Sequence, residues 1–269
     1  TGTLTQNVMT VTRLWVDDNS FTVTGSGYTP KGAFERDGQP VNLKEYPGVL
    51  TALWVGALNN DAALEENPDN GVRMVGDPTE GAILVAAEKA GALTKELNRA
   101  YPREQEIPFD SERKRMVTIH AINDPHKEDL SPFAEQTAHD YAVVIKGAPD
   151  VVLNLCTHYQ SIDDTIIPLD DSARQRILQA NDLMTKDALR VIGAAYRVIS
   201  VLPEEVNAKE LERDLVFTGL IGMIDPARPE VKPALEKAIG AGIRTIMITG
   251  DYPNTARAIA ESISLMRPG

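Results

Sequence analysis

Residues 249–251, Thr-Gly-Asp, stand where a run of apolar residues meets a predicted helix. Ligands of parallel α/β sheets bind beyond the carboxyl ends of the strands, and a helix N-terminus offers free N–H groups to an anion. Thr249 can donate its hydroxyl to a phosphate oxygen, and Gly250 permits close approach of the backbone. Taken alone, however, Asp251 is more often only the cap of the following helix.

Two other motifs join a polar side chain to a helix start. In GDPTE (76–80), Asp77 is a predicted N-cap, and Glu80 is placed to complete a capping box. In KGAPD (146–150), Lys146 ends a predicted strand, Gly147 relaxes the turn and Pro149 starts a helix. Lys146 can face a phosphate as a point charge. The local evidence alone favours a structural Glu80 and a solvent-exposed Lys146.

The stretch IPFDSERKRMV (107–117) places the aromatic Phe109 beside a turn with three cations, Arg113, Lys114 and Arg115. An aromatic face next to cations can hold a nucleobase and its phosphates. The structural alternative is a core phenylalanine followed by a solvated basic turn. For this motif taken alone, that alternative is favoured.

Composition and missing motifs exclude several classes of protein. The 269 residues carry a net charge of −12, which argues against nucleic-acid binding. The single cysteine, Cys156, cannot form an internal disulfide, which favours a reducing compartment. The apolar run at 215–224 is too short to span a bilayer, which takes about 20 residues. There is no P-loop, and GSGYTP (25–30) lacks the last glycine of a dinucleotide fingerprint. The sequence contains neither H-E-x-x-H nor C-x-x-C, so its motifs indicate no transition-metal site.

The C-terminal part reads as alternating strands and helices. Buried strands are predicted at 215–224 and 244–250, and a helix follows each of them, at 229–242 and 253–266. This βαβα order is typical of a parallel doubly wound sheet. Because two parallel strands need further neighbours, we expect this part and the first residues of the chain to belong to one larger α/β domain.

The middle of the chain, 8–214, is predicted to be an inserted α+β unit with an antiparallel sheet. Its short strands do not follow a βαβ order. The strands are expected at 21–25, 115–122 and 141–147, and the helices at 47–60 and 170–189.

Each motif is weak alone, but their order is specific. TGTLT, GDPTE, the Phe–basic turn, KGAP, LR, DPxR and TGD follow one another as in the P-type ion-pumping ATPases, and the chain resembles this family along its whole length. It looks most like bacterial members of the type II calcium and sodium–potassium pumps. The resemblance implies a nucleotide-binding domain (8–214) inserted in a partial Rossmann-like phosphorylation domain of the haloacid-dehalogenase type (1–7 and 215–269).

The resemblance also implies a nucleotide site. It predicts that Phe109 stacks on adenine and that Glu80 lies near the adenine amino group. Lys114 and Lys146, the latter with Gly147, are expected to line the pocket. Arg190 is expected to reach the ATP phosphates. The family's additional arginine two residues after the stacking Phe is replaced here by Ser111, so that contact is expected to be missing.

Other positions resemble the family's phosphorylation site and hinge. Thr1 resembles the residue whose backbone carbonyl binds Mg2+, Thr3 lies in the phosphate loop, and Thr249, Gly250 and Asp251 form its other side. Asp225 and Arg228 are expected to form a hinge pair near the ribose and phosphates, with Asn7 on the second hinge strand. Ala227 replaces a proline common in relatives, so the hinge is expected to be looser. The family signature begins with an Asp-Lys pair ahead of Thr-Gly-Thr-Leu-Thr, and its Asp is the phosphorylated residue.

The implied function is ATP binding within a cation pump that uses ATP and Mg2+ and forms an aspartyl-phosphate. This chain is expected to bind ATP or ADP without being phosphorylated, and to touch neither nucleic acid nor membrane. Its partners would be the transmembrane and actuator domains, on the cytoplasmic side of the plasma membrane. Two alternatives stay open: a soluble phosphatase or phosphomutase of the haloacid-dehalogenase type, and a non-catalytic nucleotide sensor. The transported ion cannot be read from these residues.

Overall fold

A computed structural model gives the fold. It describes the backbone of residues 3–67, 71–92, 94–123, 133, 140–249 and 253–266. Of the predicted site residues, Thr1, Gly250 and Asp251 lie outside this part of the chain.

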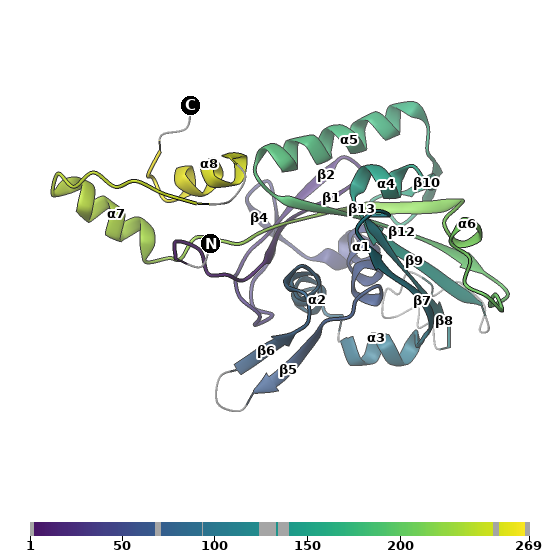
Figure 1. Ribbon diagram of the computed structural model, residues 1–269. Coiled ribbons are helices and arrows are strands. Elements are labelled where there is room, and N and C mark those ends of the chain that lie inside the picture. The colour runs from purple at the N-terminus through teal and green to yellow at the C-terminus, as the bar shows by residue number, and fades with distance from the viewer. Residues whose placement is uncertain are drawn as a thin grey trace.

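One large, mostly antiparallel sheet dominates the structure (Figure 1). Its main path runs β4 (Gln39–Val41), β3 (Phe34–Arg36), β2 (Asn19–Val23), β1 (Thr10–Val16), β13 (Leu215–Ile224), β12 (Arg190–Ile199), β9 (Tyr141–Gly147), β8 (Arg115–Ala121) and β7 (Arg103–Asp110). Two further strands, β10 (Cys156–Gln160) and β11 (Ile166–Pro168), extend from β13, and β10 pairs with it in parallel. A separate hairpin is formed by β5 (Ala63–Asn67) and β6 (Gly71–Val75). The predicted antiparallel α+β class is confirmed.

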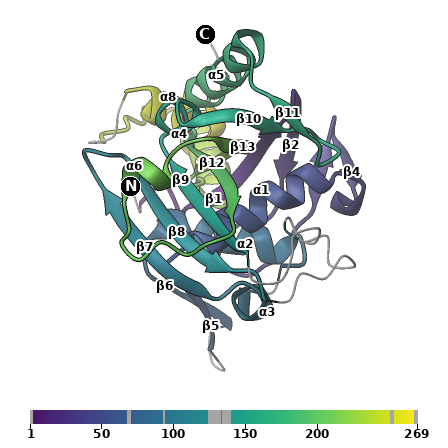
Figure 2. The ribbon, with the colours of Figure 1, turned by 90° about the vertical axis from the view of Figure 1, so that its right-hand side faces the viewer.

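Both faces of the sheet are covered, which explains why its central strands read as continuous apolar runs. In β9, Val144 faces a core formed with α1 (Pro47–Leu58), α2 (Pro78–Lys89) and α3 (Thr94–Ala100). The neighbouring Val143 and Ile145 face the opposite core, formed with α4 (Pro149–Leu153) and α5 (Asp171–Lys186). Figures 1 and 2 show these two groups of helices on opposite sides of the sheet.

The expected helices of the middle segment are confirmed. In α1 every residue from Gly48 to Leu58 is buried, so it is a core helix. In α5 the apolar spacing places Ile177, Ala180 and Met184 on the buried face, but the helix ends at Lys186 and Ala188 adopts a positive φ.

Of the predicted parallel βαβ unit at the C-terminus, the first strand is confirmed as β13, but the second strand and the parallel pairing are wrong. β13 lies between β1 and β12 and pairs antiparallel with both, so neither of its edges is free for residues 244–250. The described part of that segment, 244–249, forms no strand. Ile246 and Ile248 are 70% and 93% exposed. An apolar run forms a strand only when a neighbouring strand pairs with it, and here none does.

The helices predicted on either side of 244–250 are present. α7 (Val231–Gly240) and α8 (Pro253–Ser262) share a small core of Leu235, Ile259 and Ile263. Figure 1 shows both helices apart from the large sheet, near the N-terminus.

Two segments from opposite ends of the chain run side by side between the large sheet and α7. Thr5 forms an antiparallel bridge with Ala227, and Arg228 N donates to Leu4 O at 2.8 Å. The Asp225 carboxylate accepts a hydrogen bond from Val8 N at 3.1 Å. The predicted hinge segments therefore lie together. No described helix has the length and apolar character needed to cross a bilayer.

Candidate functional site

The predicted site residues of the middle segment meet at one end of the large sheet. The register aligns Arg115 with Gly147, and Gly147 with Gly193, so the end of β9 lies beside the starts of β8 and β12. The N-terminus of α2 lies against the same end, because Arg190 Nη1 donates to Thr79 Oγ1 at 2.8 Å. Four elements, β8, β9, β12 and α2, thus contribute to one region.

Phe109 belongs to β7 but does not enter the core. Its side chain is 64% exposed, so the interpretation as a core phenylalanine is wrong. The strand is irregular at this point, because the β7–β8 register shifts between Ile107 and Asp110. An exposed aromatic ring at the end of a sheet is available for stacking.

The basic turn after Phe109 is ordered by its own side chains. The Asp110 carboxylate accepts hydrogen bonds from the backbone N–H groups of Glu112 and Arg113, each at 2.8 Å. Lys114 closes the turn in the left-handed region, with φ of 55°. Within the described part of the chain, its ammonium group has no hydrogen bond or ion pair, and it is exposed.

Gly147 is required where β9 passes this turn. A Cβ atom at this position would lie 2.3 Å from Lys114 O and 2.7 Å from Arg115 Cβ. The next residue, Ala148, donates its N–H to the same Lys114 carbonyl at 3.0 Å. Gly147 therefore lets the turn and the end of β9 approach each other closely.

Lys146 is buried, contrary to the solvent-exposed lysine expected from local sequence. Only 8% of the residue is exposed. Its ammonium donates to Glu80 Oε1 at 2.5 Å and to the backbone carbonyl of Asn59. Burial lowers the pKa of Lys146, while the neighbouring Glu80 carboxylate opposes that shift.

Glu80 does not complete the predicted capping box. Asp77 caps α2 by accepting from the N–H groups of Thr79 and Glu80. The Glu80 carboxylate instead binds Lys146 and accepts from Asp61 N at 3.0 Å. It connects α2, the end of α1 and β9.

Arg103 and Asn59 support this arrangement, and sequence reasoning missed both. Arg103 forms ion pairs with Asp61 at 2.5 Å and Glu106 at 2.8 Å, and its other nitrogen donates to Asn60 O at 2.6 Å. The Asn59 amide donates to two backbone carbonyls, of Met116 on β8 and Val144 on β9. Neither residue lies in a recognisable motif, and only the fold brings them to Lys146.

The remaining predicted residues lie elsewhere or are not described. Thr3 is exposed and Thr249 is half-buried, and both lie outside the strands and helices that form the end of the sheet. Asn7 adopts a positive φ of 57° in the predicted hinge segment. Among the described residues, no cluster of His, Cys, Asp and Glu could hold a metal ion.

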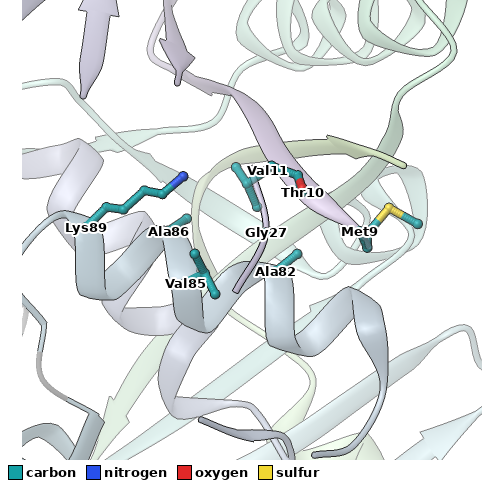
Figure 3. A pocket seen from close by; sticks show the side chains of 8 residues that line it. All are labelled: Met9, Thr10, Val11, Gly27, Ala82, Val85, Ala86 and Lys89. Atoms are coloured by element: carbon teal, nitrogen blue, oxygen red, sulfur yellow. The ribbon is translucent and has the colours of Figure 1, made fainter. Parts of the chain in front are cut away.

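A small pocket lies away from these residues, between α2 and β1 (Figure 3). Its lining is mostly apolar and includes Met9, Val85 and Ala86. Lys89 lies at one side, and its ammonium donates to the backbone carbonyl of Thr24 at 2.8 Å. Lys89 therefore has a structural role there, closing the loop that follows β2.

Comparison with known proteins decides the family. The model for the P-type ATPase cytoplasmic domain N matches residues 49–230. The chain belongs to this family.

Three relatives of the chain are cation pumps by name. It is 36% identical over 267 residues to the "Calcium-transporting ATPase" of Bacillus subtilis. This match covers 99% of the present chain and 28% of the relative. It is also 36% identical over 269 residues to the "Probable cation-transporting ATPase F" of Mycobacterium tuberculosis H37Rv, spanning 99% of this chain and 27% of the relative. To the "Cation-transporting ATPase pma1" of Synechocystis it is 35% identical over 274 residues, spanning 100% and 28%. The chain thus spans about 28% of the length of the curated relatives that it matches.

The N-domain match includes the residues gathered at the end of the sheet and both predicted hinge residues, Asp225 and Arg228. It begins after β1 and β2, yet β1 pairs with β13 inside the matched region. In this N domain, residues ahead of the matched part complete the central sheet.

Proposed function

We propose that the chain is the ATP-binding part of a P-type cation-transporting ATPase, and that the nucleotide binds at the sheet end that carries Phe109. The observation that carries this proposal is the exposed ring of Phe109 on the same hairpin as the exposed Lys114, at the same end as the buried Lys146–Glu80 pair. A stacking face next to cations recognises a base and its phosphates.

In this proposal each residue has a distinct part. Adenine stacks on Phe109, and the Glu80 carboxylate accepts a hydrogen bond from the adenine amino group. Lys114 and Arg190 are both exposed and reach the phosphates. Lys146 contributes its charge from a buried position and holds Glu80 in place. Gly147 has no side chain, so it leaves space beside the turn at Lys114.

The parent pump would couple ATP hydrolysis, through an aspartyl-phosphate and Mg2+, to ion transport. This chain would bind nucleotide on the cytoplasmic side of the plasma membrane. Phosphoryl transfer depends mainly on positioning and charge neutralisation. We propose that Asp225 and Arg228 form the hinge over which the nucleotide approaches the phosphorylation domain, to which Thr1, Thr3, Thr249, Gly250 and Asp251 would belong.

We place the start of the C-terminal phosphorylation-domain piece near Asp225 rather than at residue 215. β13 pairs with β12 on one edge and with β1 and β10 on the other, and is therefore part of the N-domain sheet. A haloacid-dehalogenase-type phosphatase is less well supported, because the N-domain match covers the inserted middle segment.

Titration of the chain with ATP and with ADP tests the proposal, followed by NMR chemical shifts of the backbone amides. Both nucleotides should cause saturable shifts near Phe109 and Gly147, with similar affinities, because recognition rests on the adenosine end. Addition of Mg2+ should change either affinity little. Absence of saturable shifts with both nucleotides would refute the proposal.

A further inference from the structure

Glu212 is a buried carboxylate that forms ion pairs with the hairpin carrying Phe109. It follows the short helix α6 (Ala208–Leu211), and its side chain is only 4% exposed. One carboxylate oxygen accepts from Arg113 Nη2, and the other accepts from Arg115 Nη2 at 2.5 Å. Arg115 Nη1 also donates to Arg113 O at 2.9 Å. The carboxylate therefore ties together two positions of one tight turn.

The residues on either side of Glu212 are held in the core of the protein. Leu211 and Leu215, on either side of Glu212, are buried in the core beside α5. The loop ahead of α6 is tied to β7, because Gln105 Nε2 donates to Pro203 O at 3.0 Å. Glu212 is therefore anchored through its neighbours in the core, and the loop ahead of α6 adds a contact with β7 of the hairpin itself.

The contacts of Glu212 with the hairpin lie on the face of the sheet opposite to Lys146. Side chains alternate along β8. Met116 contacts the Lys146 ammonium, whereas Val117 packs in the same core as Leu211. The hairpin is thus fixed from one face by Glu212 and faces the candidate nucleotide site with the other.

Phe109 needs such support because packing does not hold it. With a ring that is 64% exposed, its position depends on the backbone of the hairpin. That hairpin closes at the pair of Asp110 and Arg115, directly after Phe109. Without the carboxylate, the guanidinium groups of Arg113 and Arg115 would repel each other at short range, which would weaken the turn that Asp110 orders.

We propose that Glu212 is a positioning residue for nucleotide binding, which holds the β7–β8 hairpin so that Phe109 can stack on the base. This inference rests on the proposed function of the sheet end. It assigns Glu212 no contact with the nucleotide: Glu212 acts through its two arginines.

The test is titration of the wild type and Glu212→Gln with adenosine, which has no phosphates, followed by NMR. Glu212→Gln should bind adenosine about 5-fold more weakly. This loss corresponds to a part of the free energy of one base stack. In a Phe109→Ala background, the same substitution should change adenosine affinity less than about 2-fold, because the ring it positions is gone. The matched control is Glu210→Gln on α6, an exposed residue with the same change of charge, which should bind like the wild type.

The outcomes separate this inference from the function on which it rests. If Phe109→Ala binds adenosine more weakly than the wild type, but Glu212→Gln binds it like Glu210→Gln while folded, the positioning role is refuted. An equal loss in both backgrounds also refutes it. If Glu212→Gln does not fold, Arg113→Gln replaces it, because Arg115 still neutralises the carboxylate, and the same losses are required of it. If the wild type shows no saturable adenosine binding, the proposed function itself fails.

Discussion

Replacement of Phe109 by Ala should weaken nucleotide binding without unfolding the chain. A single base stack on an aromatic side chain contributes about 1–3 kcal/mol, which corresponds to a loss of about 5- to 140-fold in affinity. The ring is 64% exposed and makes little core contact, so the free energy of unfolding should change by less than about 0.5 kcal/mol. Binding and stability are thus expected to separate in this variant.

The assay combines titration with ADP, followed by NMR, and urea unfolding of the same samples. Val201→Ala is the matched control, because Val201 is 77% exposed and lies in the loop after β12. It should match the wild type in both measurements. A folded Phe109→Ala that binds ADP as tightly as Val201→Ala would show that the ring does not stack on the base.

Three further predictions concern stability and exchange. Lys146→Met should lower the free energy of unfolding, measured in urea, by about 3–5 kcal/mol, because it leaves the buried Glu80 carboxylate without its cation. Lys209→Met, at an exposed position, should change the free energy of unfolding little. Equal effects of the two substitutions would refute the pairing. Burial lowers the pKa of His120 to about 4. The unfolded state therefore binds the extra proton first, and stability should fall by about 3 kcal/mol as the pH falls from about 6.5 to about 4. His120→Asn should remove that part of the pH dependence, and an unchanged profile would contradict the assignment. In hydrogen exchange, amides of residues 244–249 should exchange much faster than those of β9, since they form no strand; equal protection would show that this segment pairs in solution.

The fold of the middle segment could be predicted because its signals are local. The apolar spacing of α5 and the cap at Asp77 act within a few residues, and both appear in the structure as expected. The segment at 244–250 has an equally clear apolar run, but a strand also needs a partner. β13 was expected to be that partner, and its two edges are taken by β1 and β12.

Several of the residues that meet at the end of the sheet were named from the sequence, but the exposure of their side chains was not predicted. Order of motifs along the chain indicated Phe109, Glu80 and Lys146, and local statistics misjudged the exposure of both Phe109 and Lys146. Exposure depends on what packs against a residue, and for Lys146 that is the end of α1 and the N-terminus of α2. Arg103 and Glu212 could not be found, since their partners lie up to 99 residues away in sequence.

The central claim is that adenine binds on Phe109, and intermolecular nuclear Overhauser effects test it most directly. The chain is labelled with 13C in its phenylalanine rings and saturated with ADP. Cross-peaks are expected between adenine H2 or H8 and the ring protons of Phe109, with amide shifts centred on Gly147. Cross-peaks of adenine to residues of the α2–β1 pocket around Met9 and Val85, with none to Phe109, would contradict it.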